Sequence, residues 1–255
     1  METIFMIHGM WVGSWCFDRY KAFFEGKGYR VVAPTLPYHD TDPNGPPHPM
    51  VGTASLQEYS AFLEGEIRKL DAPPIVMGYS MGGLLAQILA ARGLGKAHIL
   101  LMPAPPAGVF ALRPSVVWSF MEGLTHWAFW RKPFKPSFGK TVYAMLHLTA
   151  PEDQKKFYER MVYESGWASA QIGFWPFDFS KGAYVDETKV SQPMLVISGS
   201  EDRITPAAVV RKVAAKYAHV AEHREFPGMA HNVMGEAGWE DVAWAVHDWL
   251  KTKNL

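Results

Sequence analysis

The sequence has little cysteine, no long apolar run and no excess of charge. Cys16 is the only cysteine among 255 residues, so an intramolecular disulfide is excluded and a reducing cytoplasm is the expected compartment. No stretch reaches the roughly 18 uninterrupted apolar residues that a membrane-spanning helix needs. The N-terminus lacks the basic start and the small-residue cleavage site of a signal peptide, so we expect no secretory leader.

Charge and glycine patterns exclude further classes. The 25 basic and 25 acidic side chains cancel, and no long run of one sign appears, so nucleic acid is not an expected partner. No glycine-rich dinucleotide fingerprint or phosphate loop follows the first apolar segment, and we therefore expect no nucleotide cofactor. The remaining chain is 48% hydrophobic and long enough for one large domain or a domain with an insertion.

The stretch 75–91 organises the chain. An apolar triplet, Ile75 to Met77, predicts a short buried strand, and the apolar run 84–91 predicts a buried helix. Between them lies Gly-x-Ser-x-Gly, centred on Ser80. A strand that turns sharply into a helix holds its middle residue in a strained conformation, and side chains two positions away would clash. This turn exposes the Ser80 hydroxyl and places the next backbone N–H at a helix N-terminus, where negative charge is favoured.

Strands and helices alternate on both sides of this turn. The alternation predicts an α/β fold with a mostly parallel sheet covered by helices on both faces. Ser55 with Glu58 three residues later predicts a capping box at the start of a helix. The further expected strands are 4–7, 29–33, 98–102, 194–197 and 224–226.

The alternation breaks between residues 105 and 190. This segment holds five of the ten Trp and nine of the fifteen Phe. We interpret it as a cap inserted after the strand at 98–102, with 1–104 and 191–255 forming the core. Insertions at the carboxyl end of a strand lie where active sites of open α/β sheets form. We therefore expect an apolar pocket lined by Trp11, Trp118, Trp127 and Trp130. Aromatic and basic residues together also permit weak contact with a membrane surface.

Two further loops carry the residues that Ser80 needs. A serine is a weak nucleophile unless a base takes its proton and a carboxylate orients that base. Asp202, beside Glu201, follows the strand at 194–197, and His231 follows the strand ending at Phe226. Because both loops leave the carboxyl ends of strands, they share an edge of the sheet with Ser80. The order Ser, acid, His is that of α/β-hydrolases.

The chain resembles the α/β-hydrolase superfamily over nearly its whole length. The landmarks are the His8-Gly9 loop, GYSMGG around Ser80, GSED before RITP, and GMAH ending at His231. The resemblance implies that Ser80 is the nucleophile, Asp202 the acid and His231 the base. It also implies an oxyanion hole from the backbone N–H groups of Met10 and Met81, and a structural His8.

The opening HGMWVGSWCF is similar to the branch of plant methylesterases and hydroxynitrile lyases. The lyases carry Lys directly after the catalytic His, where this chain has Asn232. The GYSMGG turn around Ser80 is also similar to that of the menaquinone-pathway synthase, which has Arg where this chain has Leu84. Only seven residues precede His8, so we do not expect the antiparallel strands that open many members.

The main hypothesis is a cofactor-free serine hydrolase that cleaves carboxylic esters of small apolar substrates. One alternative is a carbon–carbon bond hydrolase that uses the same three residues. Another is a receptor that keeps the hydrolase shape and binds a ligand without turnover. The sequence leaves the oligomeric state open.

One further pattern resembles a metal-binding motif. His219-Val220-Ala221-Glu222-His223 matches a zinc-peptidase motif that requires one helix carrying both histidines. The pattern straddles a helix end and an edge strand, so its side chains should diverge. We therefore predict no metal site.

Overall fold

The computed structural model describes residues 1–255. Its centre is a six-stranded sheet in the order β2-β1-β3-β4-β7-β8, and every neighbouring pair of strands is parallel. The strands are β1 (Thr3–Ile7), β2 (Arg30–Val32), β3 (Ile75–Tyr79), β4 (Ala97–Leu101), β7 (Met194–Gly199) and β8 (Ala221–Phe226). The expected α/β fold with a parallel sheet is confirmed. All six expected strands form, although β8 begins three residues before its predicted start at 224 and is not an apolar run.

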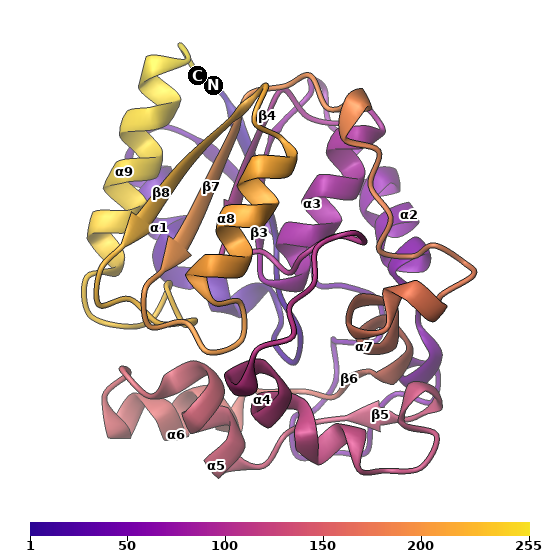
Figure 1. Ribbon diagram of the computed structural model, residues 1–255. Helices are drawn as coiled ribbons and strands as arrows, with labels where there is room; N and C mark the ends of the chain where they lie inside the picture. Colours follow the sequence, from indigo (N-terminus) through magenta and orange to yellow (C-terminus); the bar gives the residue numbers. More distant parts are fainter.

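Helices cover both faces of the sheet (Figure 1). They are α1 (Asp18–Gly26), α2 (Leu56–Ile67), α3 (Met81–Ala91), α8 (Ala207–Lys216) and α9 (Trp239–Thr252). Alternate residues of β1 enter different clusters, with Ile4 and Met6 packing beneath α1 and α9, and Phe5 and Ile7 beneath α2, α3 and α8. Since successive strand side chains point to opposite faces, the continuous apolar runs bury the sheet on both sides.

The capping box at α2 is only half formed. The Ser55 hydroxyl accepts a hydrogen bond from the Glu58 N–H at 3.0 Å, as the sequence predicts. The Glu58 carboxylate does not return to Ser55 and instead accepts from the Tyr38 hydroxyl at 2.6 Å. This part of the prediction is wrong because the loop before α2 offers Glu58 a closer partner.

The segment between β4 and β7 lies across the carboxyl ends of the strands (Figure 1). Its helices are α4 (Pro114–Leu124), α5 (Phe138–Thr141), α6 (Pro151–Glu159) and α7 (Gly166–Gly173). It also holds a π-helical turn, η4 (Val142–Leu146), and an antiparallel pair, β5 (Pro133–Phe134) with β6 (Glu164–Ser165). The remaining short 3-10 turns of the chain are η1 (Ser14–Phe17), η2 (Val51–Thr53), η3 (Phe129–Arg131), η5 (Trp175–Phe177) and η6 (Glu187–Lys189).

We call residues 105–190 the cap. Both chain ends lie at the end of the molecule opposite the cap (Figure 1). None of the helices in the molecule combines the length and the apolar character that crossing a bilayer requires.

Candidate active site

Ser80 sits at the sharp turn from β3 into α3. Its backbone has φ 55° and ψ −118°, a conformation that side-chain-bearing residues rarely adopt. The flanking glycines permit this turn, since a Cβ on Gly78 would collide with the Gly82 carbonyl oxygen. A Cβ on Gly82 would collide with the Ile7 carbonyl oxygen of the neighbouring strand. The close approach of β1 and α3 therefore forces the strained geometry that the sequence predicts.

Three polar side chains from different loops meet at this turn. His231 Nε2 lies 3.0 Å from Ser80 Oγ, and His231 Nδ1 lies 2.7 Å from Asp202 Oδ2. Because a carboxylate only accepts, Nδ1 carries the proton it donates to Asp202. In the neutral ring Nε2 is then the acceptor for the Ser80 hydroxyl proton. The three residues have exposed fractions of 8%, 5% and 1% for Ser80, Asp202 and His231, so the relay is largely shielded from water.

Asp202 is held as an anion. Burial by itself would raise the pKa of Asp202, but His231 and hydrogen bonds from His231 and Thr205 lower the pKa below its usual value. The backbone N–H groups of Ile204 and Thr205 both donate to Oδ1, at 2.8 and 2.9 Å. Neighbouring Glu201 is exposed and accepts from the Ser200 hydroxyl instead. Asp202, and not Glu201, is therefore the carboxylate that faces His231.

The two residues predicted to form the oxyanion hole, Met10 and Met81, belong to segments that meet at Ser80. Met81 is the first residue of α3, and the first N–H groups of a helix have no partner within it. The loop before Met10 runs against Ser80, since a Cβ on Gly9 would lie 2.9 Å from Ser80 Cβ. Only glycine allows this approach. The structure thus brings both predicted oxyanion-hole residues to the nucleophile turn.

His8 is a structural residue of this loop, as expected. Its Nε2 accepts from the Leu36 N–H at 2.9 Å, which leaves Nδ1 to donate to the Gly9 carbonyl oxygen at 2.8 Å. Burial, with nearby His39, lowers the pKa of His8 to about 3. The neutral ring therefore fixes the backbone that presents Met10.

The four tryptophans predicted to bind substrate occupy different environments. Trp11 is buried, with φ 64°; its indole N–H donates to the Phe134 carbonyl at 3.0 Å, and its own carbonyl accepts from the Val162 N–H. It thereby joins the Met10 loop to the cap. Trp118, Trp127 and Trp130 are exposed on the cap, with exposed fractions of 48%, 85% and 36%. A substrate-binding role for the four residues stays a prediction.

Methionines from the core and the cap belong to one large hydrophobic cluster. Met10 and Met81 belong to the same hydrophobic cluster as Met145 and Leu146 of the π-helical turn η4. Unbranched methionines adapt to irregular shapes at little cost. The core and the cap therefore share one apolar cluster at this site.

A buried ion pair also connects the cap to the core, and no sequence pattern indicates it. His39 Nε2 lies 2.9 Å from the carboxylate of Glu164 in β6. Its Nδ1 faces the Pro37 carbonyl oxygen at 2.9 Å, so both ring nitrogens donate and the ring is a cation. Burial by itself would lower the pKa of His39, yet Glu164 raises it. The Tyr59 hydroxyl donates to the other Glu164 oxygen at 2.9 Å.

Glu236 is a second residue that the sequence does not reveal. Its two carboxylate oxygens accept from the Ala230 N–H, directly before His231, at 3.1 and 3.0 Å. Burial raises the pKa of Glu236 to about 7. The only signal in the sequence is an acidic residue five positions after His231, and this position alone does not indicate what Glu236 contacts.

The residues of the zinc-peptidase pattern diverge as expected. His219 Nε2 donates to the Val190 carbonyl at 2.7 Å, and His223 lies 2.9 Å from the Ser198 hydroxyl. Glu222 pairs with Lys253 at 2.7 Å. No group of three or more His, Cys, Asp or Glu side chains is placed to hold a metal ion.

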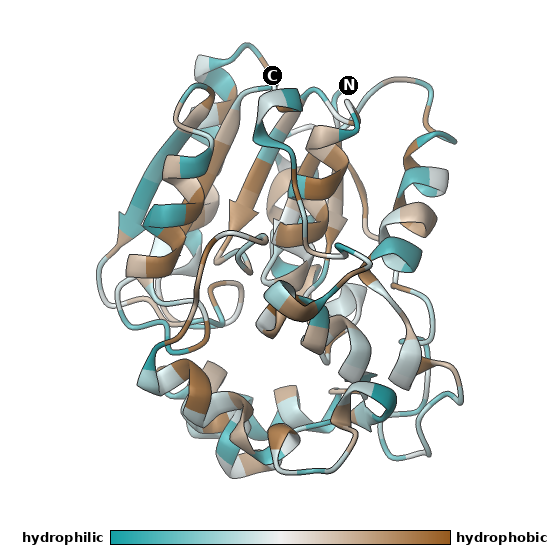
Figure 2. Ribbon diagram, turned by 45° about the vertical axis from the view of Figure 1, so that its right-hand side comes forward, coloured by the Kyte–Doolittle hydropathy of each residue, from teal (hydrophilic) through white to brown (hydrophobic).

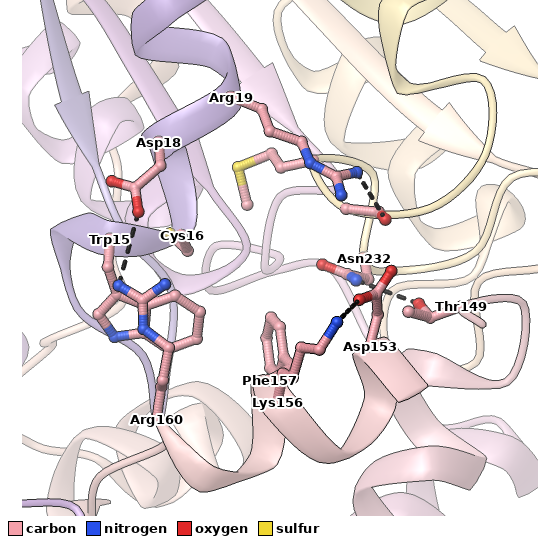
Figure 3. Close-up of a pocket in the computed structure, with 12 residues that line it drawn as sticks. Trp15, Cys16, Asp18, Arg19, Thr149, Asp153, Lys156, Phe157, Arg160 and Asn232 are labelled. Carbon is pink, nitrogen blue, oxygen red and sulfur yellow. Dashed lines mark hydrogen bonds and ion pairs between the residues drawn. The ribbon is translucent and has the colours of Figure 1, made fainter. Parts of the chain in front are cut away.

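A polar cavity of about 270 Å³ lies between η1 and the start of α1 on one side and α6 on the other (Figure 3). Arg19, Lys156 and Arg160 line it, but each is engaged, with the Gly235 carbonyl, Asp153 and Asp18 respectively. Asn232, directly after His231, reaches this cavity and donates to the Thr149 hydroxyl at 3.1 Å. Ser80 does not line it, so it is not the expected apolar pocket.

Comparisons with known proteins agree with this geometry. A family model described as "Alpha/beta hydrolase family" matches residues 4–246. Similar solved structures include a monoacylglycerol lipase from Paleococcus ferrophilus, 20% identical, with a TM-score of 0.71 over 97% of this chain and 93% of that one. A pyrethroid hydrolase from Sphingobium faniae is 18% identical, with a TM-score of 0.73 over 98% and 97% of the two chains.

A methylesterase from Arabidopsis is 10% identical, with a TM-score of 0.69 over 97% of this chain and 98% of that one. At these identities the likeness concerns the fold. No curated protein sequence matches the chain.

Proposed function

The chain belongs to the alpha/beta hydrolase family, and on that basis we propose that it is a serine hydrolase that cleaves carboxylic esters of apolar substrates. The observation that carries this proposal is the continuous hydrogen-bond relay from Ser80 through His231 to Asp202, with contacts of 3.0 and 2.7 Å. Nucleophile, base and orienting carboxylate in this order constitute the arrangement that activates a serine.

In the first half-reaction, Ser80 Oγ attacks the ester carbonyl carbon while His231 Nε2 takes the hydroxyl proton. The carbonyl oxygen becomes an anion, which the N–H groups of Met10 and Met81 stabilise. Preorganised donors of this kind are worth about 3–4 kcal/mol each when they face the developing charge. As the carbon–oxygen bond to the alcohol breaks, the imidazolium returns its proton to the leaving oxygen, and the acyl group stays on Ser80.

The second half-reaction repeats these roles with water. His231 removes a proton from a water molecule whose oxygen attacks the acyl carbon, and the bond to Ser80 Oγ breaks as His231 returns the proton to it. Asp202 remains ionised throughout, because its lowered pKa favours the carboxylate that pairs with the imidazolium.

Two features support esters of apolar groups. Met10 and Met81, which flank Ser80 as the proposed oxyanion-hole residues, belong to a hydrophobic cluster that also includes Met145 and Leu146 of the cap. The proteins of similar fold include a lipase, a pyrethroid hydrolase and a methylesterase. An apolar wall favours longer acyl chains by about 0.8 kcal/mol per buried methylene, a factor of about four in specificity.

The test is a series of p-nitrophenyl esters of increasing acyl length. We expect kcat/KM to rise from acetate to medium-chain esters, and esters with a charged acyl group to react poorly. Higher kcat/KM for acetate than for hexanoate would contradict the apolar acyl pocket. A single burst of product without further turnover would contradict hydrolysis and favour a ligand receptor.

A further inference from the structure

The cap presents an unusual concentration of apolar side chains to solvent. Of the seventeen large hydrophobic residues that are exposed, fourteen lie between Phe110 and Tyr184. In Figure 2 the ribbon of the cap, at the bottom of the molecule, carries brown apolar segments interspersed with pale and teal ones. Large contiguous apolar patches are rare on monomers and mark interaction sites.

Part of this area forms a continuous surface. Trp118, Met121 and Leu124 lie at helical spacing on α4 and are exposed, and Trp127 lies three residues after the end of the helix. Trp127 contacts Trp130 with ring centroids 6.1 Å apart, and the chain of ring contacts continues through Phe129 to Phe174. We call Trp118, Met121, Leu124, Trp127, Trp130 and Phe174 the cap surface.

The charges in the segment that carries most of the cap surface are mainly positive. Residues 105–149 contain five cationic side chains and one acidic side chain, Glu122. None of the five cations forms an ion pair with a carboxylate. The five are Arg113, Arg131, Lys132, Lys135 and Lys140. Lys140 lies over the ring of Trp118, 3.4 Å from its centroid, so a cation and an aromatic ring share one site.

We propose that the cap surface docks onto an anionic lipid surface. Tryptophan and phenylalanine bury their rings at the boundary between headgroups and acyl chains, while lysine and arginine remain among the anionic headgroups. Lys135 and Lys140 donate to backbone carbonyl oxygens, whereas Arg113, Arg131 and Lys132 are exposed and can face anionic phospholipid headgroups. This inference concerns an interaction surface and does not require Ser80 to be catalytic.

A second copy of the chain fits the same surface less well. A two-fold dimer would place this patch against itself and bring unpaired cations from both copies together. Like charges facing one another across an interface oppose association. An anionic bilayer can bury the apolar residues and also attract the cations.

Sedimentation with vesicles tests the proposal. The protein should bind vesicles of phosphatidylcholine mixed with phosphatidylglycerol and should bind much less to phosphatidylcholine alone. High salt should weaken the binding, because screening acts over about 8 Å at physiological ionic strength. Arg131→Gln and Lys132→Gln should each reduce the affinity about fivefold.

The chain offers a matched control for the aromatic residues. Trp118 and Trp244 are exposed to 48% and 44%, and each lies beneath a lysine, Lys140 and Lys27 respectively. Trp118→Asp should reduce vesicle affinity about tenfold or more. Trp244→Asp, in α9, should leave it unchanged. Should Trp118→Asp fold poorly, Trp127→Asp at the more exposed position provides the same comparison.

Three outcomes would overturn the proposal. They are equal binding to both vesicle types, equal loss in the Trp118 and Trp244 variants, and a salt-resistant dimer that Trp127→Asp dissociates. Ser80→Ala keeps the cap surface and should bind vesicles like the unaltered protein. Vesicle binding by a protein without esterase activity would therefore contradict only the proposed function.

Discussion

The proton relay depends on one carboxylate. Asp202 is buried against His231, whereas Glu201 beside it is exposed and directed to Ser200. Asp202→Asn should lower kcat by about two to four orders of magnitude, because an amide can no longer favour the required ring tautomer and stabilise the imidazolium. Glu201→Gln is the matched control and should change kcat less than about twofold. Steady-state kinetics that showed the larger loss for Glu201→Gln would reassign the acid.

Glu236 gives the stability of the protein a specific pH dependence. Its pKa is raised from 4.5 to about 7, chiefly by burial. Between these values the folded protein keeps a proton that the unfolded chain releases, so this residue makes stability fall as pH rises from 4.5 to 7. Glu236→Gln removes the titration.

Urea unfolding of both proteins over this pH range checks the prediction. The free energy of unfolding of the variant, relative to the unaltered protein, should rise with pH by about 1–3 kcal/mol and level off above pH 7. Parallel stability curves would show that Glu236 is not a buried acid that ionises within this window.

Single residues also mark the limit of prediction from sequence. Ser80, Asp202 and His231 are identifiable because each closely follows a predicted strand in a recognisable local pattern. His39 and Glu164 carry no local pattern, since they are 125 positions apart and meet only when the cap packs on the core. Buried pairs of this kind depend on tertiary structure and leave no periodic signal.

The nucleophile turn is the element on which the site is built. Gly82 lies where β1 passes α3, and a side chain there would strike the Ile7 carbonyl oxygen. Gly82→Ala should therefore destabilise the protein by several kcal/mol or prevent folding. Gly65, within α2, has no positive φ, and a Cβ added there would meet no atom within 4 Å.

Gly65→Ala is the control for this element. It should stabilise the protein by about 0.5–1 kcal/mol, because alanine loses less backbone entropy than glycine in a helix. Thermal unfolding of the two variants measures the difference. A Gly82→Ala protein as stable as the unaltered one would contradict the close contact between β1 and α3.

The central strands β3, β4 and β7 are predictable because their apolar runs are fully buried. The strand and helix around Ser80 lie where composition places them, with α3 beginning at Met81 directly after the nucleophile. The cap is less predictable. Its two-residue strands, β5 and β6, and the π-helical turn η4 are too short to produce a periodic pattern. Their geometry comes from packing against the Met10 loop and against each other.

At the scale of the whole molecule, the exposed large apolar residues gather at one end. The termini lie opposite the cap, and the cap carries most of the exposed large apolar residues (Figure 1). The formal net charge of zero also conceals the excess of cations in residues 105–149, because net charge reports only the sum over the chain. The division into core and cap remains our proposal, supported by the position of residues 105–190 over the carboxyl ends of the strands.

The central claim is that Ser80 is the activated nucleophile of a serine hydrolase. Reaction with a fluorophosphonate, followed by mass spectrometry of the peptides, tests it most directly, because the probe phosphonylates only a serine that a base has activated. We predict a single adduct on Ser80, no adduct in Ser80→Ala, and strongly slowed labelling in His231→Ala. An unlabelled Ser80 in folded protein, or ester turnover that persists in Ser80→Ala, would contradict the claim.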